Sequence, residues 1–271
     1  MTISVKMIAD SISPTGVRIS TMQLTYPRFI HSELMTHRVF SRNASSSRAI
    51  PVSRMLSNVR TDPAMPIHWG TNKPGMQAGE ELSPIKRLTA MSLWRIGGRL
   101  MCVVAWCMSK LGLHKQVANR LLEPWQHIHV VVTSTEWDNF FALRCHPDAQ
   151  PEFQDLAKLM RRVMSMSLPR KLKYGEWHLP YVTLDERAEY SISDAVRVSA
   201  ARCCRVSYMN HEGKNTTLDQ DLDLYNKLVT AKPPHMSPVE HQATASPEDK
   251  FYFNLRGWQS NRWWIEAAAT L

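Results

Sequence analysis

The sequence predicts an α+β fold, in which an antiparallel sheet packs with several helices. Two early segments, residues 3–9 and 17–26, are rich in β-branched and aromatic side chains, which favours strands. Longer segments further along the chain have the apolar spacing of helices, and they outnumber the strand segments. A chain of 271 residues is long enough to bury one full core. We therefore expect a single domain over residues 1–271, with residues 57–115 as a candidate helical insertion.

The order of the elements follows from local signals. Gly16 and the Ser-Pro pair just before it supply a turn between the two strands. Pro27 then opens a helix over residues 28–38, since proline is well tolerated in a first helical turn. Residues 57–83 contain several prolines and glycines and are expected to form a loop. Further helices are expected over residues 84–112, 115–122, 137–145, 152–166, 193–208 and 219–230, with a strand beginning at residue 129 and a joint over residues 175–182.

The net charge of +9 restricts the class of partner. A basic protein binds either nucleic acid or small ligands that carry phosphates or carboxylates. The basic residues are spread over the whole chain, and the zinc-finger spacing is absent from the sequence. A small anionic ligand is therefore favoured, and nucleic-acid binding is kept as the alternative.

The cysteine count and the hydropathy pattern indicate a cytoplasmic protein. The five cysteines form no CxxC pair, and an odd count does not fit a disulfide framework. The N-terminal segment lacks the apolar core of a secretion signal. Residues 100–109 are the most apolar segment, but Arg99 and Lys110 enclose only ten residues, which suits a buried helix and is too short to span a bilayer.

The segment THRVFSRNASSSRAIP, residues 36–51, concentrates groups that bind anions. Arginine binds phosphate through two parallel hydrogen bonds, and serine hydroxyls with loop N–H groups complete such a site. In an extended loop, Ser46 and Arg48 would point to the same side and hold one phosphate. His37 and Asn43 add hydrogen-bonding groups suited to a flat heterocycle. A solvated basic surface loop is the alternative interpretation.

A second segment, HMSPVEH over residues 235–241, allows two interpretations. It resembles a helix start, with Ser237 as N-cap, Pro238 in the first position and Glu240 completing a capping box. That interpretation leaves His235 and His241 unassigned. They are weak candidates for metal ligands, because the spacing is not HExxH and the sequence shows no third ligand.

A third segment, FFALRCHPDAQPEF over residues 140–153, places Arg144 and His146 near a helix end, where they could face a ligand. The alternative is an amphipathic helix whose aromatic side chains belong to the core. The sequence contains neither a glycine-rich dinucleotide fingerprint nor a Walker loop, so a flavin or nucleotide would not bind on a Rossmann turn.

These segments together resemble the family of flavin-dependent thymidylate synthases (ThyX). The family signature is RHRxxSxNExSxRY, and six of its residues occur here at the family spacing: His37, Arg38, Ser41, Asn43, Ser46 and Arg48. HMSPVEH is similar to the family motif HxSPxEH, and residues 131–157 resemble the family segment that ends in LR…AQxEIR. AARCCRVSY, residues 200–208, is similar to the family segment AARxCYxS.

The order of the motifs differs from that of typical members. In those proteins the AARxCYxS and SPxEH segments precede the RHR signature, whereas here they follow it. The chain therefore resembles a divergent, rearranged or circularly permuted member. Such a change is physically tolerated when the termini lie close together and the elements pack as before.

The resemblance implies a ThyX-like fold, a set of ligands and a role for each matching residue. FAD would bind at His37, Arg38, Asn43, Arg144, Ser237 and Glu240, and the substrate at Glu33, Ser46, Ser47, Arg48 and Gln154. NADPH and methylenetetrahydrofolate are the implied co-substrates, and the family assembles as a homotetramer with shared active sites. The family uses no protein nucleophile, so the resemblance assigns Ser46 to binding.

The departures from the signature concern the substrate. Thr36, Ala44 and Ala49 replace the Arg, Glu and Tyr of the family, and Gln154 stands where the family has a substrate-binding arginine. Glutamine offers an acceptor as well as a donor, whereas arginine offers only donors. Gln154 would therefore accept a hydrogen bond from the exocyclic amine of cytosine. The sequence leaves open deoxyuridylate or deoxycytidylate as substrate and a methyl or a hydroxymethyl product. A nucleotide- and flavin-binding protein without synthase activity is the second hypothesis.

Overall fold

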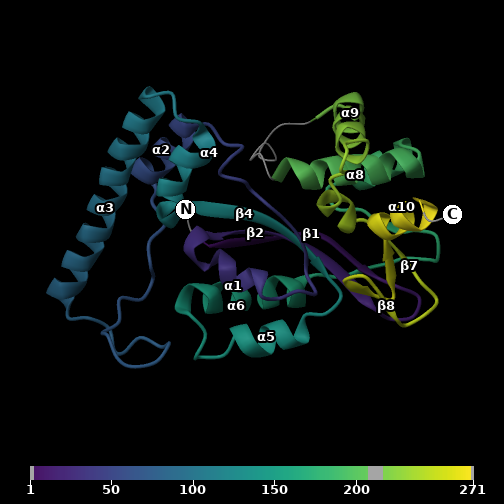
Figure 1. Ribbon diagram of the computed structural model, residues 1–271. Coiled ribbons are helices and arrows are strands. Elements are labelled where there is room, and N and C mark those ends of the chain that lie inside the picture. The colour runs from purple at the N-terminus through teal and green to yellow at the C-terminus, as the bar shows by residue number, and fades with distance from the viewer. Residues whose placement is uncertain (1–2, 207–215, 270–271) are drawn as a thin grey trace.

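The computed structural model describes residues 3–206 and 216–269, and it shows helices on both faces of a five-stranded sheet (Figure 1). The strand order is β3-β4-β2-β1-β5. The strands are β1 (Ser4–Ile12), β2 (Arg18–Pro27), β3 (Ser41–Ala44), β4 (His127–Ser134) and β5 (Arg170–Lys171). All neighbouring pairs are antiparallel except β1 and β5. The predicted α+β class with an antiparallel sheet is confirmed.

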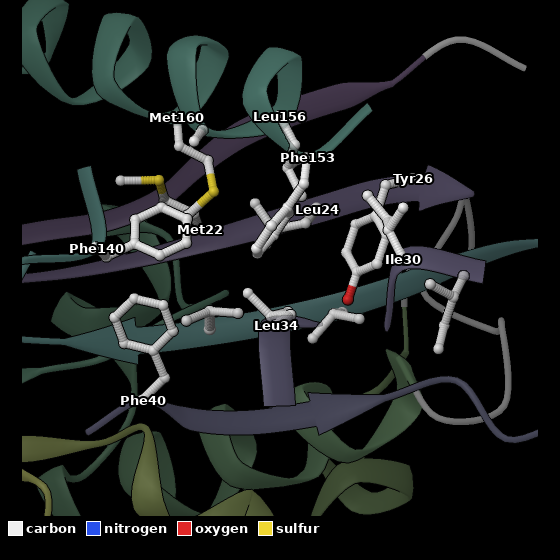
Figure 2. Packing of buried hydrophobic residues seen from close by; sticks show 14 of the residues in the cluster. Met22, Leu24, Tyr26, Ile30, Leu34, Phe40, Phe140, Phe153, Leu156 and Met160 are labelled. Atoms are coloured by element: carbon white, nitrogen blue, oxygen red, sulfur yellow. The ribbon is translucent and has the colours of Figure 1, made fainter. Parts of the chain in front are cut away.

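The main core lies on one face of this sheet. Side chains alternate between the faces of a strand, so Met22 and Leu24 of β2 point to the same side, and their β4 partners are Val132 and Val130. Three helices cover this face: α1 (His31–Met35), α5 (Asp138–Arg144) and α6 (Pro151–Met166). Figure 2 shows the side chains that meet there: Met22, Leu24, Tyr26, Ile30, Leu34, Phe40, Phe140, Phe153, Leu156 and Met160.

Helix α8 (Ile192–Arg205) covers the other face. Val131 of β4 points away from the main core and packs against Cys203 and Val206. Helix α9 (Leu218–Val229) lies against α8, and both are on the opposite side of the sheet from α5 and α6 (Figure 1). The buried Asp221 carboxylate joins the two helices, because it accepts hydrogen bonds from both Arg202 and Arg205.

A third group of helices lies beside the sheet and includes most of the residues that we expected to form an insertion. It consists of α2 (Val52–Thr61), α3 (Pro84–Lys110), α4 (Lys115–Ala118) and the 3-10 helix η2 (Asn119–Trp125). A Cβ on Gly98 of α3 would lie 2.9 Å from the ring of Trp125, so only glycine allows α3 to approach this closely. Whether residues 57–115 are an insertion stays a prediction.

The C-terminal part adds small elements. Strands β6 (Trp177–His178), β7 (Ala243–Ala245) and β10 (Trp258–Ser260) form a second sheet in the order β10-β7-β6. The remaining elements are α7 (Leu184–Glu189), the 3-10 helix η4 (Ser237–Glu240), β8 (Phe251–Tyr252), β9 (Leu255–Arg256) and α10 (Asn261–Ala269).

Four predictions of local structure were wrong. The helix expected over residues 28–38 is a 3-10 helix, η1 (Arg28–Ile30), followed by α1, which ends at Met35. The loop expected over residues 57–83 begins inside α2, because α2 presents Met55, Leu56 and Val59 to a second apolar cluster. Part of the expected extended loop pairs with β4 as the edge strand β3. The fourth is the short buried helix expected over residues 100–109. These residues belong to the 27-residue helix α3, and only 17% of the apolar part of that helix is buried.

Candidate functional site

The segment of residues 36–51 is divided between the two faces of the sheet. Thr36 and His37 follow α1 on the face covered by α5 and α6. Strand β3 then runs along the edge of the sheet, and residues 45–50 emerge beside α4 and α8. Because an edge strand separates its two ends, the segment contributes to two different clusters of polar side chains.

The first cluster lines a cleft of about 350 Å³, formed by β3, the following loop, α4, α8, α9 and η4. We call it the β3 cleft. Its lining residues are Asn43, Ser46, Arg48, Ala49, Gln116, Cys204, Leu228, His235, Ser237 and Pro238. The cleft thus combines donors such as Arg48 and Gln116 with apolar walls from Leu228 and Pro238. That mixture suits an anionic ligand with a flat ring.

A pair of hydrogen bonds joins the two sequence motifs inside this cleft. The Ser237 hydroxyl donates to Oδ1 of Asn43 at 3.0 Å, although the two residues are 194 positions apart. The Asn43 Nδ2 donates to the carbonyl of Cys203 in α8 at 3.1 Å. Asn43 is buried, and these bonds leave one of its amide hydrogens free for another acceptor. The HMSPVEH and AARCC segments therefore pack against the signature segment in the folded chain, in spite of their late position in the sequence.

The capping box predicted at Ser237 is wrong. The segment forms only the short 3-10 helix η4, and no side chain caps its first turn. The Ser237 hydroxyl bonds to Asn43 instead, and the Glu240 carboxylate accepts from Arg262 at 2.6 Å. Because the hydroxyl is directed at β3, Ser237 lines the cleft, whereas Glu240 is held by α10.

The loop after β3 turns more tightly than predicted. The N–H of Ala49 donates to the carbonyl of Ser46 at 3.0 Å, which closes a turn where we expected an extended chain. Ser46 and Arg48 nevertheless line the same cleft. Ser47 lies between them but is buried, and its hydroxyl donates to Glu123 at 2.6 Å. Its side chain is thus directed into the protein.

The second cluster surrounds Arg144 at the end of α5, and we call it the Arg144 cluster. Its guanidinium donates to Nε2 of His37 at 3.0 Å, to Glu33 at 3.1 Å and to Thr36 at 3.3 Å. The same guanidinium lies over the ring of Phe153, 4.7 Å from its centroid. One arginine therefore holds three side chains that are remote in sequence from α5, and it also packs on Phe153 of α6.

Burial sets the protonation of this cluster. Desolvation, with the nearby charges of Arg144 and Arg42, lowers the pKa of His37 to about 4. The imidazole is therefore neutral at pH 7, and since Nε2 accepts from Arg144, the proton is assigned to Nδ1. Burial raises the pKa of Glu33, and the charge of Arg144 opposes that shift.

The other predicted residues lie apart from the β3 cleft. Gln154 of α6 donates to the carbonyl of His146 at 2.6 Å and accepts from Lys158 at 2.7 Å. Arg38 is exposed near the end of α1. Arg42 is absent from the family signature, and here it donates to the carbonyls at the end of α1, so it stabilises that helix terminus. Of the AARCCRVSY segment, Ser207 and Tyr208 lie outside the described residues.

Sequence reasoning missed three residues of the cleft. Gln116 carries no local signal that would assign it to a ligand, and Cys204 stands in the AARCC segment, for which the sequence indicates no ligand. His235 was recognisable only as a weak metal candidate, yet it lines the cleft two residues before Ser237. Burial raises the pKa of the Cys204 thiol to about 11, so this side chain is a neutral wall at physiological pH.

Comparison with known proteins gives one family. A family model described as thymidylate synthase complementing protein (Thy1) matches residues 13–170, which is more than half of the chain. The match includes β3, α5 and α6, and ends before the AARCC and HMSPVEH segments. No curated protein matches the chain.

Solved structures extend the comparison. A UMP/dUMP methylase, PolB, from Streptomyces cacaoi bound with 5-Br UMP is 15% identical, with a TM-score of 0.50, and the match covers 60% of this chain and 88% of that chain. The flavin-dependent thymidylate synthase ThyX from Helicobacter pylori, complexed with FAD and dUMP, is 17% identical with a TM-score of 0.36, over 54% of this chain and 67% of that chain. The likeness to the methylase shows a shared fold.

Proposed function

We propose that this chain, which belongs to the family of thymidylate synthase complementing proteins, transfers a one-carbon unit to C5 of a pyrimidine deoxynucleotide monophosphate. The substrate is deoxyuridylate or deoxycytidylate, and the product is the methyl or hydroxymethyl derivative. The observation that carries the proposal is the hydrogen bond between Ser237 and Asn43, since it joins, at one cleft, the two segments that resemble ligand-binding motifs of the family. PolB, whose fold is shared, is a methylase of UMP and dUMP.

The loop side of the β3 cleft suits the nucleotide. Arg48 is exposed and forms no hydrogen bond or ion pair within the described part of the chain, so its guanidinium is available to a phosphate. Ser46 lies in the same turn and adds a hydroxyl. Gln116 faces them from α4 and offers both a donor and an acceptor. These groups bind and orient a nucleotide without supplying a nucleophile.

The other side of the cleft suits a flavin ring. The free amide hydrogen of Asn43 can donate to a ring heteroatom, and the Ser237 oxygen, whose hydrogen is donated to Asn43, can accept from a ring N–H, while Pro238 and Leu228 provide apolar walls. FAD, when bound, supplies reducing equivalents, with NADPH as the source of electrons and methylenetetrahydrofolate as the source of carbon. His235 also lines the cleft and offers the hydrogen-bonding nitrogens of its imidazole.

Assembly into a homotetramer explains why the predicted residues fall into two clusters. The cleft is close to the lower end of the roughly 300–1,000 Å³ that ligand sites usually occupy, so one chain has room for part of the ligand set. Leu93, Ile96, Leu100 and Val103 of α3 are more than half exposed and recur at spacings of three and four residues, which is the pattern of a helix-to-helix seam. We propose that a second copy covers this stripe and that its Arg144 cluster completes the site.

The location that fits this function is a reducing cytoplasm. All five cysteines are free. By length and composition α3 is able to cross a membrane, but its exposed apolar stripe serves equally as a contact between chains, which is the role we propose for it.

The test is a product assay. The purified protein is incubated with FAD, NADPH, methylenetetrahydrofolate and either dUMP or dCMP, and the nucleotide is analysed by mass spectrometry. A gain of one methylene group identifies methylation, and one further oxygen identifies hydroxymethylation. Absence of product with both nucleotides, from protein that has bound FAD, would refute the synthase activity.

The identity of the base is tested at Gln154. If this residue reads cytosine in the assembled site, Gln154→Arg shifts the ratio of kcat/KM for dUMP over dCMP upward by roughly tenfold, since the acceptor is lost. Equal turnover of both nucleotides by the wild-type protein, unchanged in the variant, removes the cytosine hypothesis.

A second candidate function is supported by the altered signature. Ala44 and Ala49 replace a carboxylate and a phenol of the family; Ala44 is the last residue of β3, and Ala49 lies in the following loop and lines the β3 cleft. A yellow protein that binds nucleotide but forms no product would establish ligand binding without synthase activity. Nucleic-acid binding with a steep dependence on salt, in a protein that takes up no flavin, would establish the third hypothesis.

A further inference from the structure

The loop over residues 45–50, which presents Ser46 and Arg48 to the β3 cleft, is held by side chains from other segments. Arg28 donates to the carbonyl of Ser45 at 3.3 Å, and Lys115 donates to the carbonyl of Ala49 at 3.1 Å. The loop lies beyond Ala44, the last residue that β3 pairs with β4, and these two carbonyls accept from side chains instead. Since buried backbone carbonyls need donors, these side chains replace the ladder of a sheet.

Asn119 makes the central contact of this arrangement. Its side-chain Nδ2 donates to the carbonyl of Ser47 at 2.7 Å and to the carbonyl of Ile50 at 2.9 Å. These two carbonyls flank Arg48 in the sequence, so one amide fixes the chain on both sides of the arginine. Asn119 is fully buried, and its Oδ1 has no partner within the described residues. Both hydrogen bonds that this side chain forms within the described residues are therefore directed at the loop.

We propose that Asn119 is a positioning residue for the nucleotide, which acts by fixing the turn that aims Arg48 and Ser46 into the cleft. The identity of the ligand in this inference rests on the proposed function, whereas the geometry of the loop does not. An arginine fixed at both flanking carbonyls loses less conformational entropy when it binds a phosphate than one on a mobile loop. Nucleotide affinity should thus depend on a residue that does not line the cleft.

The informative change is Asn119→Asp, which keeps the shape of the side chain. A carboxylate has no hydrogen to donate, and it places negative charge against two carbonyl oxygens, so both contacts are lost. The matched control is Gln126→Glu. Gln126 is also a buried amide at the end of η2, but it donates to the carbonyl of Met55 in α2, outside the loop. Both variants lose stability, and only the first releases the loop.

Two measurements on the full-length protein test the inference. Isothermal titration calorimetry with dUMP and with dCMP gives the Kd of each nucleotide. For the nucleotide that the wild type binds more tightly, we expect Asn119→Asp to raise the Kd at least about tenfold. We expect the Kd of Gln126→Glu to stay within about twofold of the wild-type value. Limited digestion with trypsin, read by mass spectrometry as the appearance of the fragment that ends at Arg48, gives the order of the loop without any ligand. We expect cleavage there to be about tenfold faster in Asn119→Asp than in Gln126→Glu.

The outcomes separate this inference from the proposed function. Equal cleavage after Arg48 in both variants overturns the positioning role, whatever the nucleotide results. Equal loss of affinity in both variants overturns it as well, because the effect is then one of general stability. If wild type binds neither nucleotide, the proposed function fails, and the digestion still decides whether Asn119 fixes the loop.

Discussion

The two clusters to which the segment 36–51 contributes differ in how completely their arginines, Arg144 of α5 and Arg48 of the segment itself, are used. At the Arg144 cluster, the guanidinium is bonded to His37, Glu33 and Thr36 and is stacked on Phe153. At the β3 cleft, Arg48 is exposed and forms no hydrogen bond within the described residues. A satisfied charge contributes to the fold, whereas an unsatisfied charge beside a cleft is available to a ligand. A position close to the signature segment therefore does not decide whether an arginine stabilises the fold of the chain or is available to a ligand.

The largest effect on stability is expected for Arg144→Ala. The change leaves Glu33 and His37 without their shared partner and removes the contact with Phe153, so we expect a loss of about 2–4 kcal/mol in the free energy of unfolding. Urea denaturation measures it. Arg256→Ala is the control, since its pair with Asp249 is about half exposed and contributes little. A loss no greater than in the control would show that the cluster is not structural.

The opposite result is expected for Arg48→Ala. We expect the nucleotide to bind roughly 10- to 100-fold more weakly, while the free energy of unfolding changes by less than about 0.5 kcal/mol. Calorimetric titration and urea denaturation of the same preparation give both quantities. An unchanged affinity for both dUMP and dCMP would remove Arg48 from the site and undo the contrast with Arg144.

A smaller effect is expected for Ser237→Ala at the junction of the two motifs. It removes the hydrogen bond to Asn43, which is worth about 0.5–1.5 kcal/mol, and leaves the Asn43 amide held through its bond to the Cys203 carbonyl. The FAD content of the purified protein should fall, as measured by absorbance after denaturation. Ser47→Ala provides the comparison, because its hydroxyl bonds to Glu123 inside the protein. A drop in FAD content for Ser47→Ala alone would contradict the assignment of Ser237.

The smallest effect is expected from pH. The pKa of His37 is lowered to about 4 in the folded chain, so between its usual value of 6.5 and pH 4 the unfolded chain binds a proton that the folded chain does not. Stability should therefore be complete at pH 7 and fall as the pH drops through this window. Because the side chain is half-buried, the loss at pH 5 is at most about 1 kcal/mol. His37→Gln should flatten the pH dependence relative to wild type, and an unchanged slope would contradict the assignment.

The sequence predicted the elements whose signals are local. Strands β1 and β2, helix α6 and most of helix α3 occur close to their expected positions, because alternation and apolar spacing act over a few residues. The family resemblance was also visible, since its main signature depends on six side chains within twelve positions of the chain. Edge strand β3 was missed because its residues, SRNA, lack β-branched side chains, and its pairing with β4 depends on residues more than eighty positions away.

The sequence by itself determined the fold class, the family and the residues available for binding an anion. The tertiary structure alone decided which of them share a cleft. Ser46 and Ser47 are adjacent and chemically equal, yet a turn directs one to the cleft and the other to Glu123. Ser237 meets Asn43 across 194 positions because α8 and η4 both pack against the sheet near β3. Local propensity sets what each segment becomes, but the direction of a side chain and its partners are set by packing between segments that are distant in the sequence.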